Sequence, residues 1–161
     1  MLEGMELDHA EAVLEYGPGT GAFTGHILQR ISPNTRFAAI ELNPSMVEAF
    51  RQNHPQVLLF HESVANVRSI CDRAGIKMVD SIVCGLPWAA FTEVMQREFL
   101  DEMMRVLKPG GRFVTFAYVH GLALSPGKRF AQLLPRYFTR ISKSHIVWLN
   151  VPPAFVYRCQ R

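Results

Sequence analysis

The chain has 161 residues, of which 48% are hydrophobic and 19% are charged. That size and balance suit one globular domain built around one core. No apolar run reaches the roughly 20 residues needed to cross a bilayer, and the acidic N-terminus lacks the basic region of a secretory signal. We therefore expect a single cytoplasmic domain over residues 1–161, one that meets a membrane only peripherally.

Charge is distributed unevenly along the chain. Residues 1–80 contain ten acids and six bases, residues 81–161 contain four acids and eleven bases, and no acid follows Glu102. A basic C-terminal half favours an anionic partner such as a lipid surface or a nucleic acid; the alternative is that scattered bases only solvate the surface. Cys71, Cys84 and Cys159 form no CxxC or His/Cys cluster, so we expect free, buried thiols and no metal site.

Short aliphatic and β-branched runs alternate with amphipathic segments along most of the chain. The predicted strands are 12–16, 36–42, 56–60, 77–84 and 112–118. Helices are predicted over 23–31, from 43 onward, over 66–74, around 99–107 and over 127–134. Asn43-Pro44 is a helix start, with Asn at the N-cap and Pro at the first helical position. We expect Pro135 to stop the last helix and residues 108–111 to form a loop before the fifth strand.

Two further strands are predicted at the end of the chain, near 139–149 and 155–160. No helix separates them, so they should pair as an antiparallel hairpin at one edge of the sheet. The alternation before them predicts a parallel sheet covered by helices on both faces. The expected fold class is therefore α/β, Rossmann-like and doubly wound, with a mostly parallel seven-stranded sheet and an antiparallel C-terminal β-hairpin.

The most informative motif joins the first strand to the first helix: Glu15-Tyr16-Gly17-Pro18-Gly19-Thr20-Gly21. Ligands of open α/β sheets bind beside this turn, glycines let the backbone approach a ligand closely, and a helix N-terminus attracts anionic groups. The spacing is G-x-G-x-G, whereas the dinucleotide fingerprint is G-x-G-x-x-G. An acid stands two residues before the first glycine. These features indicate a small-molecule site that is not a dinucleotide site.

This motif resembles motif I of the S-adenosylmethionine-dependent methyltransferases, and the terminal hairpin resembles their class I fold. The resemblance implies that residues 15–21 hold the methionine part of S-adenosylmethionine, whose product is S-adenosylhomocysteine, with Glu15 orienting its amino group. Glu41 and Leu42 end the second strand, where a carboxylate can accept the ribose hydroxyls; alternatively, Glu41 only caps the next helix. Backbone at Ser63 and Val64 would contact adenine, unless Ser63 is a plain helix cap.

The loop after the fourth strand bears on the substrate. Amino-methylating enzymes that act on adenine resemble [ND]-P-P-[YFW] or N-L-P-Y here, whereas this chain has Gly85-Leu86-Pro87-Trp88. Glycine offers no acceptor for the adenine amino group, which ranks an adenine substrate lower, and leaves Gly85 as a cofactor contact. Leu86, Pro87, Trp88 and Phe91 are the expected substrate-binding residues, because aromatic faces attract a methylated ammonium; core packing is the alternative for the two aromatics.

The chain resembles the short bacterial phosphatidylethanolamine N-methyltransferases over nearly its whole length. The matching stretches are 13–24, 40–44, 84–87, 110–114 and 150–157. Sequences of this type have often been named ribosomal RNA adenine dimethylases. Relatives carry a segment before motif I that can cover the site, but here about a dozen residues precede the first strand. Leu2, Met5 and Leu7 allow one helical turn, so we expect this lid to be short or missing.

Methyl transfer from a sulfonium is an in-line displacement, in which alignment and exclusion of water matter most. Tyr118 and His120 follow the fifth strand and are the candidate catalytic residues, as groups that reach the acceptor amine. The expected function is N-methylation of a phospholipid amine. The alternatives are an RNA adenine dimethylase, a small-molecule methyltransferase, and a binding protein without turnover. Phosphates of a lipid or RNA partner would meet Lys128, Arg129, Arg136, Arg140 and Lys143.

Overall fold

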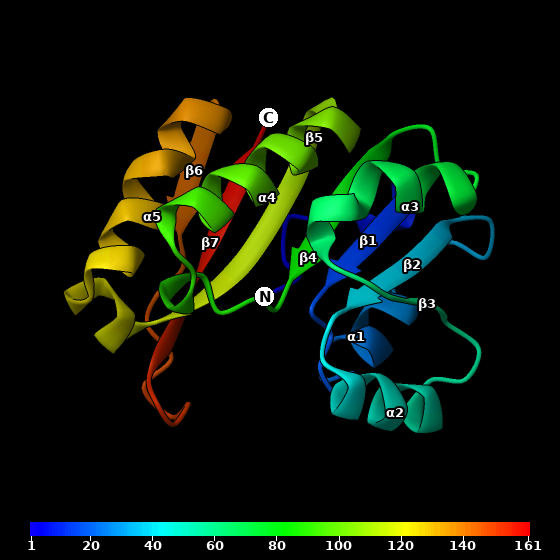
Figure 1. Ribbon diagram of the computed structural model, residues 1–161, viewed down its shortest axis with the longest axis horizontal. Coiled ribbons are helices and arrows are strands. Elements are labelled where there is room, and N and C mark those ends of the chain that lie inside the picture. Colours follow the sequence, from blue (N-terminus) through cyan, green and yellow to red (C-terminus); the bar gives the residue numbers. More distant parts are fainter.

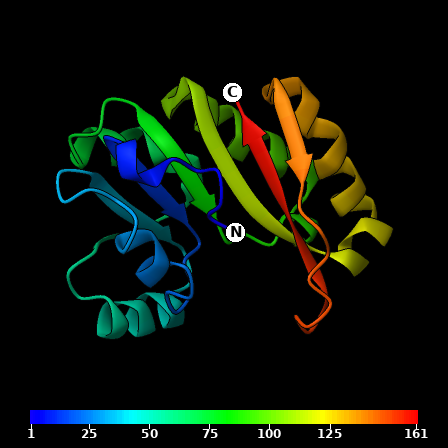
Figure 2. The same ribbon diagram turned by 180° about the vertical axis from the view of Figure 1, so that it is seen from behind.

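The computed structural model describes residues 1–161 as one seven-stranded sheet with the strand order β3-β2-β1-β4-β5-β7-β6 (Figures 1 and 2). The strands are β1 Ala12–Tyr16, β2 Arg36–Glu41, β3 Leu58–His61, β4 Val79–Cys84, β5 Leu107–Tyr118, β6 Arg140–Lys143 and β7 Ala154–Gln160. The first five are parallel, and β7 pairs antiparallel with both β5 and β6. The predicted fold class is confirmed, including the terminal hairpin.

Five α-helices and four short 3-10 turns connect the strands. The helices are α1 Thr24–Leu28, α2 Pro44–Asn53, α3 Val67–Arg73, α4 Glu93–Val106 and α5 Ser125–Tyr137. The start of α2 is as predicted, because the Asn43 side chain accepts hydrogen bonds from the amides of Ser45 and Met46. No helix is long and apolar enough to cross a membrane.

The two faces of the sheet carry cores of different size. Residues of α3, α4 and α5 pack on one face in a cluster of 27 buried residues, and these helices lie together in Figure 1. On the other face, Ile27 of α1 joins Leu2, Met5 and Leu7 of the N-terminal segment in a cluster of eight. The segment contains a single 3-10 turn, Leu7–His9. Adjacent strand residues point to opposite faces, so β1, β4 and β5 each contribute buried residues to both cores.

Neither Pro135 nor residues 108–111 end or begin an element as predicted. The helix α5 continues through Pro135 to Tyr137; a proline removes one backbone bond, but Phe130, Leu133 and Leu134 are buried against the sheet and hold the last turn in place. The strand β5 begins at Leu107, before the predicted loop. Its first residues bulge away from β4, with Gly110 at a φ of 76°, and are held because Gly110 and Gly111 exchange backbone hydrogen bonds with Arg161.

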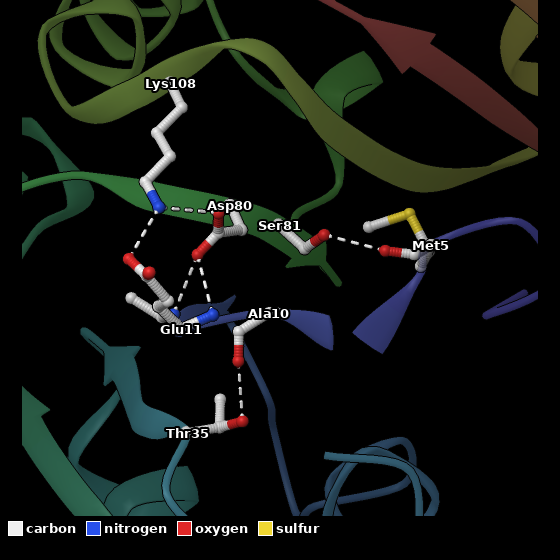
Figure 3. Close-up of polar contacts among 8 residues, drawn as sticks. Met5, Ala10, Glu11, Thr35, Asp80, Ser81 and Lys108 are labelled. Carbon is white, nitrogen blue, oxygen red and sulfur yellow. Dashed lines mark hydrogen bonds and ion pairs between the residues drawn. The ribbon is translucent and has the colours of Figure 1, made fainter. Parts of the chain in front are cut away.

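The amino ends of the strands are closed by a polar network (Figure 3). One oxygen of Asp80 accepts the amides of Glu11 and Ala12, each at 2.9 Å, and the other lies 2.7 Å from the Lys108 ammonium. Lys108 also reaches the Glu11 carboxylate at 2.9 Å. The Ser81 hydroxyl donates to the carbonyl of Met5 at 2.9 Å. These contacts join the starts of β1, β4 and β5 and anchor the N-terminal segment.

The hairpin that ends the sheet has a long connection. The strand β6 is shorter than predicted, and beyond it only an isolated bridge between Val147 and Ala154 continues the pairing. Residues 144–153 therefore form a projecting loop at the carboxyl end of the parallel strands, where α5 also begins (Figures 1 and 2).

Candidate functional site

The glycine motif forms a tight loop at the carboxyl ends of β1 and β4. Gly17, Gly19 and Gly21 have φ values of 58°, 60° and 95°, a region that side chains rarely tolerate. The Gly17 amide donates to the carbonyl of Ile40 at 2.8 Å, and the Gly85 amide donates to that of Tyr16 at 2.7 Å. The loop is thus tied to the strands on both of its sides.

Gly85 approaches the glycine loop too closely for any side chain. A Cβ atom built on Gly85 would overlap the carbonyl oxygen of Gly17, and one built on Gly17 would lie 2.6 Å from a methyl carbon of Leu86. The first contact is with backbone, which cannot rotate away. Position 85 therefore has no room for Asn or Asp on this backbone.

A cavity of about 460 Å³ opens beside this loop, a volume in the usual range for small-molecule sites. Among its lining residues are Gly17, Pro18, Gly19, Thr20, Gly85, Phe23, Phe116, Tyr118, Val147, Asn150 and Ala154. Its walls therefore come from the glycine loop, the end of β5 and the β6–β7 connection. The sequence pattern did not single out Phe116, which shares a strand face with Tyr118 and packs 5.4 Å from it between ring centroids.

Glu15 is a buried carboxylate with one oxygen that accepts no hydrogen bond. The Thr24 hydroxyl donates to Oε2 at 2.7 Å, whereas Oε1 has no partner. Burial raises the pKa of Glu15 to about 7, against the opposing effect of the Thr24 hydrogen bond. An unpartnered buried oxygen costs free energy until a donor reaches it. A cationic amino group meets that need, so Glu15 fits the methionine end of S-adenosylmethionine.

Glu41 is held by three backbone amides. One oxygen accepts from Leu42 and Asn43, each at 2.9 Å, and the other accepts from Gly19 at 3.1 Å. The helix α2 is capped by the Asn43 side chain, so Glu41 holds the two residues before the helix and does not cap its first turn. A carboxylate has about four acceptor positions, which leaves one on the Gly19 side for a ribose hydroxyl. The Leu42 side chain is exposed.

Several other predicted cofactor residues contribute backbone only. The Tyr16 ring is fully buried in the larger core. The Ser63 hydroxyl accepts from the Ala65 amide at 3.2 Å and caps the 3-10 turn Val64–Asn66, while the Val64 side chain packs in the core. Neither Ser63 nor Val64 borders the cavity, so the adenine contact stays a prediction.

The position of Trp88 favours core packing, the alternative to its predicted substrate contact, although its ring also lines the second cavity. Its indole is 3% exposed and stacks on Phe130 with centroids 4.3 Å apart and planes 14° apart. Phe91 meets it edge-on at 6.1 Å and packs against Phe99. Both aromatics are core residues, which was the alternative. Leu86 packs against the same core and Pro87 borders a second cavity.

Tyr118 separates the two cavities. It borders the larger one and also the second, of about 70 Å³, which His120 lines as well. The rings of Tyr118 and His120 stack, with their centroids 5.5 Å apart and their planes at 10° to each other. The Tyr157 hydroxyl and the Trp88 indole nitrogen, both from residues lining the second cavity, are buried without partners. Tyr118 is therefore placed to contact a molecule in either space.

The three cysteines are free and buried, as predicted. Burial raises the pKa of Cys71 and Cys84 to about 11 and that of Cys159 to about 12. A thiol with such a pKa is almost entirely protonated near pH 7 and is a poor nucleophile. No group of three or more His, Cys, Asp or Glu side chains is placed to hold a metal ion.

Comparison with known sequences gives a family and a relative. A family model described as "Methyltransferase domain" matches residues 13–111. Over 158 residues, the chain is 27% identical to an ornithine lipid N-methyltransferase of Singulisphaera acidiphila, a match that spans 95% of this chain and 77% of the relative.

Solved structures of low sequence identity share the fold. The N-methyltransferase NodS from Bradyrhizobium japonicum superposes with a TM-score of 0.77 at 16% identity, over 98% of this chain and 90% of that one. NodS has also been solved with S-adenosyl-L-homocysteine. Fibrillarin from Aeropyrum pernix, solved with natively bound S-adenosyl-L-methionine, gives a TM-score of 0.70 at 14% identity, over 98% of this chain and 70% of that one.

Proposed function

Since the chain belongs to the methyltransferase domain family and is an S-adenosylmethionine-dependent methyltransferase, we propose that its methyl acceptor is the primary or partly methylated amine of a lipid. The relative named ornithine lipid N-methyltransferase, which matches almost the entire chain, supports this class of acceptor. The phosphatidylethanolamine type of headgroup belongs to the same chemical class, an amine carried by a lipid.

The close contact between Gly85 and Gly17 is the structural observation that carries the proposal. Recognition of an adenine amino group needs an acceptor at the first position of this loop, and the Gly17 carbonyl occupies the space that its Cβ would need. An RNA adenine acceptor therefore lacks its recognition group here. A lipid amine needs no such acceptor, because it is recognised by cation–π contact and shape.

The residues around the cavity suit an amine that must lose a proton. A lipid amine resembles the lysine amine, whose pKa in water is about 10.4, and so enters mostly protonated. The apolar walls at Phe23, Phe116 and Phe155 lower that pKa by desolvation, and the Tyr118 ring offers its face to the remaining cation. His120, stacked on Tyr118, fixes that ring. It lines the second cavity and not the larger one, so we assign it to take the proton through an intervening water.

The bound cofactor supplies an electrophilic methyl group. The chain's own residues then have three tasks: Glu15 neutralises the amino group of the methionine part, the glycine loop packs its backbone closely against that part, and Tyr118 aligns the acceptor amine. Exclusion of water falls to the apolar walls and to the β6–β7 connection, since Val147 and Asn150 border the cavity.

The direct test is transfer of a labelled methyl group from S-adenosylmethionine to candidate acceptors. We expect label in ornithine lipid or phosphatidylethanolamine presented in mixed micelles, and a loss of at least about tenfold in kcat for Tyr118→Ala. Adenine-containing RNA and a water-soluble amine serve as competing acceptors. Label in RNA alone, or in the soluble amine alone, would overturn the proposal.

A further inference from the structure

The connection between β6 and β7 carries a concentrated apolar surface, which we call the hairpin tip and define as residues 146–151. Its apolar members are Ile146, Val147, Trp148, Leu149 and Val151, exposed by 38%, 54%, 70%, 97% and 93%. A soluble monomer rarely leaves adjacent large apolar side chains this open. Figures 1 and 2 show the loop projecting below the sheet, where the body of the protein does not cover it.

The one polar side chain of the tip bonds within the loop. The Asn150 side-chain amide donates to the carbonyl of Pro152 at 2.6 Å, and this contact does not depend on water. The backbone amides of Trp148 and Leu149 have no partner in the protein. Unpaired amides are too costly for the hydrocarbon core, which limits the tip to the interfacial layer, where tryptophan is enriched.

The charge around the tip favours an anionic lipid surface. Lys143 stands at the end of β6, with its ammonium 5.7 Å from the Phe155 centroid and 5.3 Å from the Tyr157 centroid. Lys128 is exposed near the start of α5, on the same edge of the sheet (Figure 1). Neither lysine forms an ion pair, whereas the neighbouring Arg129 lies 3.9 Å from Glu93. Basic residues beside an interfacial apolar surface attract anionic headgroups.

The tip is also continuous with the cavity. Val147 and Asn150 belong both to the tip and to the lining of the 460 Å³ cavity. A surface that rests on Trp148 and Leu149 therefore lies against the mouth of the site, and a lipid headgroup reaches the cavity without leaving the bilayer.

We propose that the hairpin tip docks the enzyme on an anionic lipid bilayer, with Trp148 and Leu149 in the interfacial layer, and so holds the cavity mouth against the headgroups. This inference rests on the proposed lipid acceptor. It is tested with vesicles of phosphatidylcholine and phosphatidylglycerol, which contain no methylatable amine, so that docking and methylation are measured separately.

The experiment measures vesicle co-sedimentation and quenching of tryptophan emission by brominated lipids. The buried Trp88 is shielded, so wild-type quenching reports Trp148. We expect the variant W148S/L149S to bind vesicles at least about tenfold more weakly, and Lys143→Gln about fivefold more weakly at low salt and unchanged at high salt. Leu58→Ser, which removes an exposed apolar side chain at the opposite edge of the sheet, is the matched control and should bind as wild type.

Two results would overturn the docking proposal: vesicle binding that is absent while S-adenosylmethionine still binds, or equal binding by W148S/L149S. A concentration-dependent dimer that W148S/L149S dissociates would instead assign the tip to contact between copies of the chain. If the protein binds vesicles but methylates no lipid amine, the proposed function is wrong and the docking proposal stands. If the protein methylates lipid in micelles but does not bind vesicles, the docking proposal is wrong and the proposed function stands.

Discussion

The two ends of the parallel strands in this protein are built on opposite principles. At the amino ends, Asp80, Lys108 and Glu11 satisfy one another and the starting amides of β1 (Figure 3). At the carboxyl ends, Glu15 keeps a buried oxygen without a partner, three glycines take left-handed conformations, and the hairpin tip stands in solvent. Polar groups are paired at the amino ends, whose role is structural. At the carboxyl ends, where a ligand would bind, a buried polar group is left without a partner.

This contrast separates stability from function. Changes at the amino ends should alter the free energy of unfolding and leave cofactor binding intact, whereas changes at the carboxyl ends should do the reverse, except where backbone itself is displaced.

Gly85→Asn should have the largest effect, because it places a Cβ against the Gly17 carbonyl. We expect a loss of about 3 kcal/mol in the free energy of unfolding, the upper part of the range for overpacking, and no measurable cofactor binding. Thermal unfolding and calorimetry measure the two effects. Gly25→Ala is the control, since a Cβ there meets nothing within 4 Å; equal behaviour of the two variants would contradict the argument.

Glu15→Gln should weaken S-adenosylmethionine binding by about 100-fold, because it removes the buried charge that we assign to pair with the amino group. The same variant should be at least as stable as wild type at pH 8. The pKa of Glu15 is raised by burial to about 7 in the folded protein, from an ordinary value of 4.5. The folded state therefore holds a proton that the unfolded state has lost between about pH 4.5 and 7, and the free energy of unfolding falls as the pH rises through this range. Glutamine does not ionise, so the variant avoids this loss. A variant that loses binding and stability together would show that Glu15 has a structural role.

Asp80→Ala should have the opposite effect to Glu15→Gln: it should lower the free energy of unfolding and leave cofactor affinity nearly unchanged. It leaves the amides of Glu11 and Ala12 and the ammonium of Lys108 without their acceptor, which should cost about 2 kcal/mol of unfolding free energy. Denaturant unfolding measures this loss, and the dissociation constant for S-adenosylmethionine should stay within about twofold of wild type. A large drop in cofactor affinity would mean that the two ends of the strands are coupled.

The smallest expected effect is a pH dependence of cofactor binding. A cationic amino group binds the ionised form of Glu15, so binding should release a proton below the pKa of about 7. Affinity should rise about tenfold per pH unit well below that pKa and level off above it. Calorimetry in buffers of different ionisation enthalpy at about pH 6 counts the released protons, and Glu15→Gln should release none.

The sequence pattern predicted features that depend on local periodicity. The alternation of strands and helices, the Asn43 cap and the terminal hairpin follow from short-range preferences, and the structure has them. The prediction that Pro135 ends the last helix is wrong because the burial of Leu133 and Leu134 outweighs one lost hydrogen bond. The pattern could not place Trp88, because a residue after a strand can turn into the core as easily as toward the site.

Other features of the site depend on distance in space and could not be predicted. The missing partner of Glu15 follows from how Thr24 and the loop pack around it, and the overlap at Gly85 follows from the approach of two separate loops. The role of Asp80 likewise requires Lys108, 28 positions away. The apolar run in residues 146–151 is visible in the sequence, but only its place beyond the short β6 shows that nothing covers it.

The position of β7 between β5 and β6 has a consequence for folding. Until residues 154–160 arrive, β5 presents an unpaired edge of the kind that promotes aggregation, and β7 closes it with seven residue pairs. The same event brings Ala154, Phe155 and Val156 to the cavity wall and turns residues 144–153 into a projecting loop. A chain in which β7 has not yet paired exposes the aggregation-prone edge of β5. It also lacks one wall of the cavity and the hairpin tip, so both depend on the pairing of the last strand.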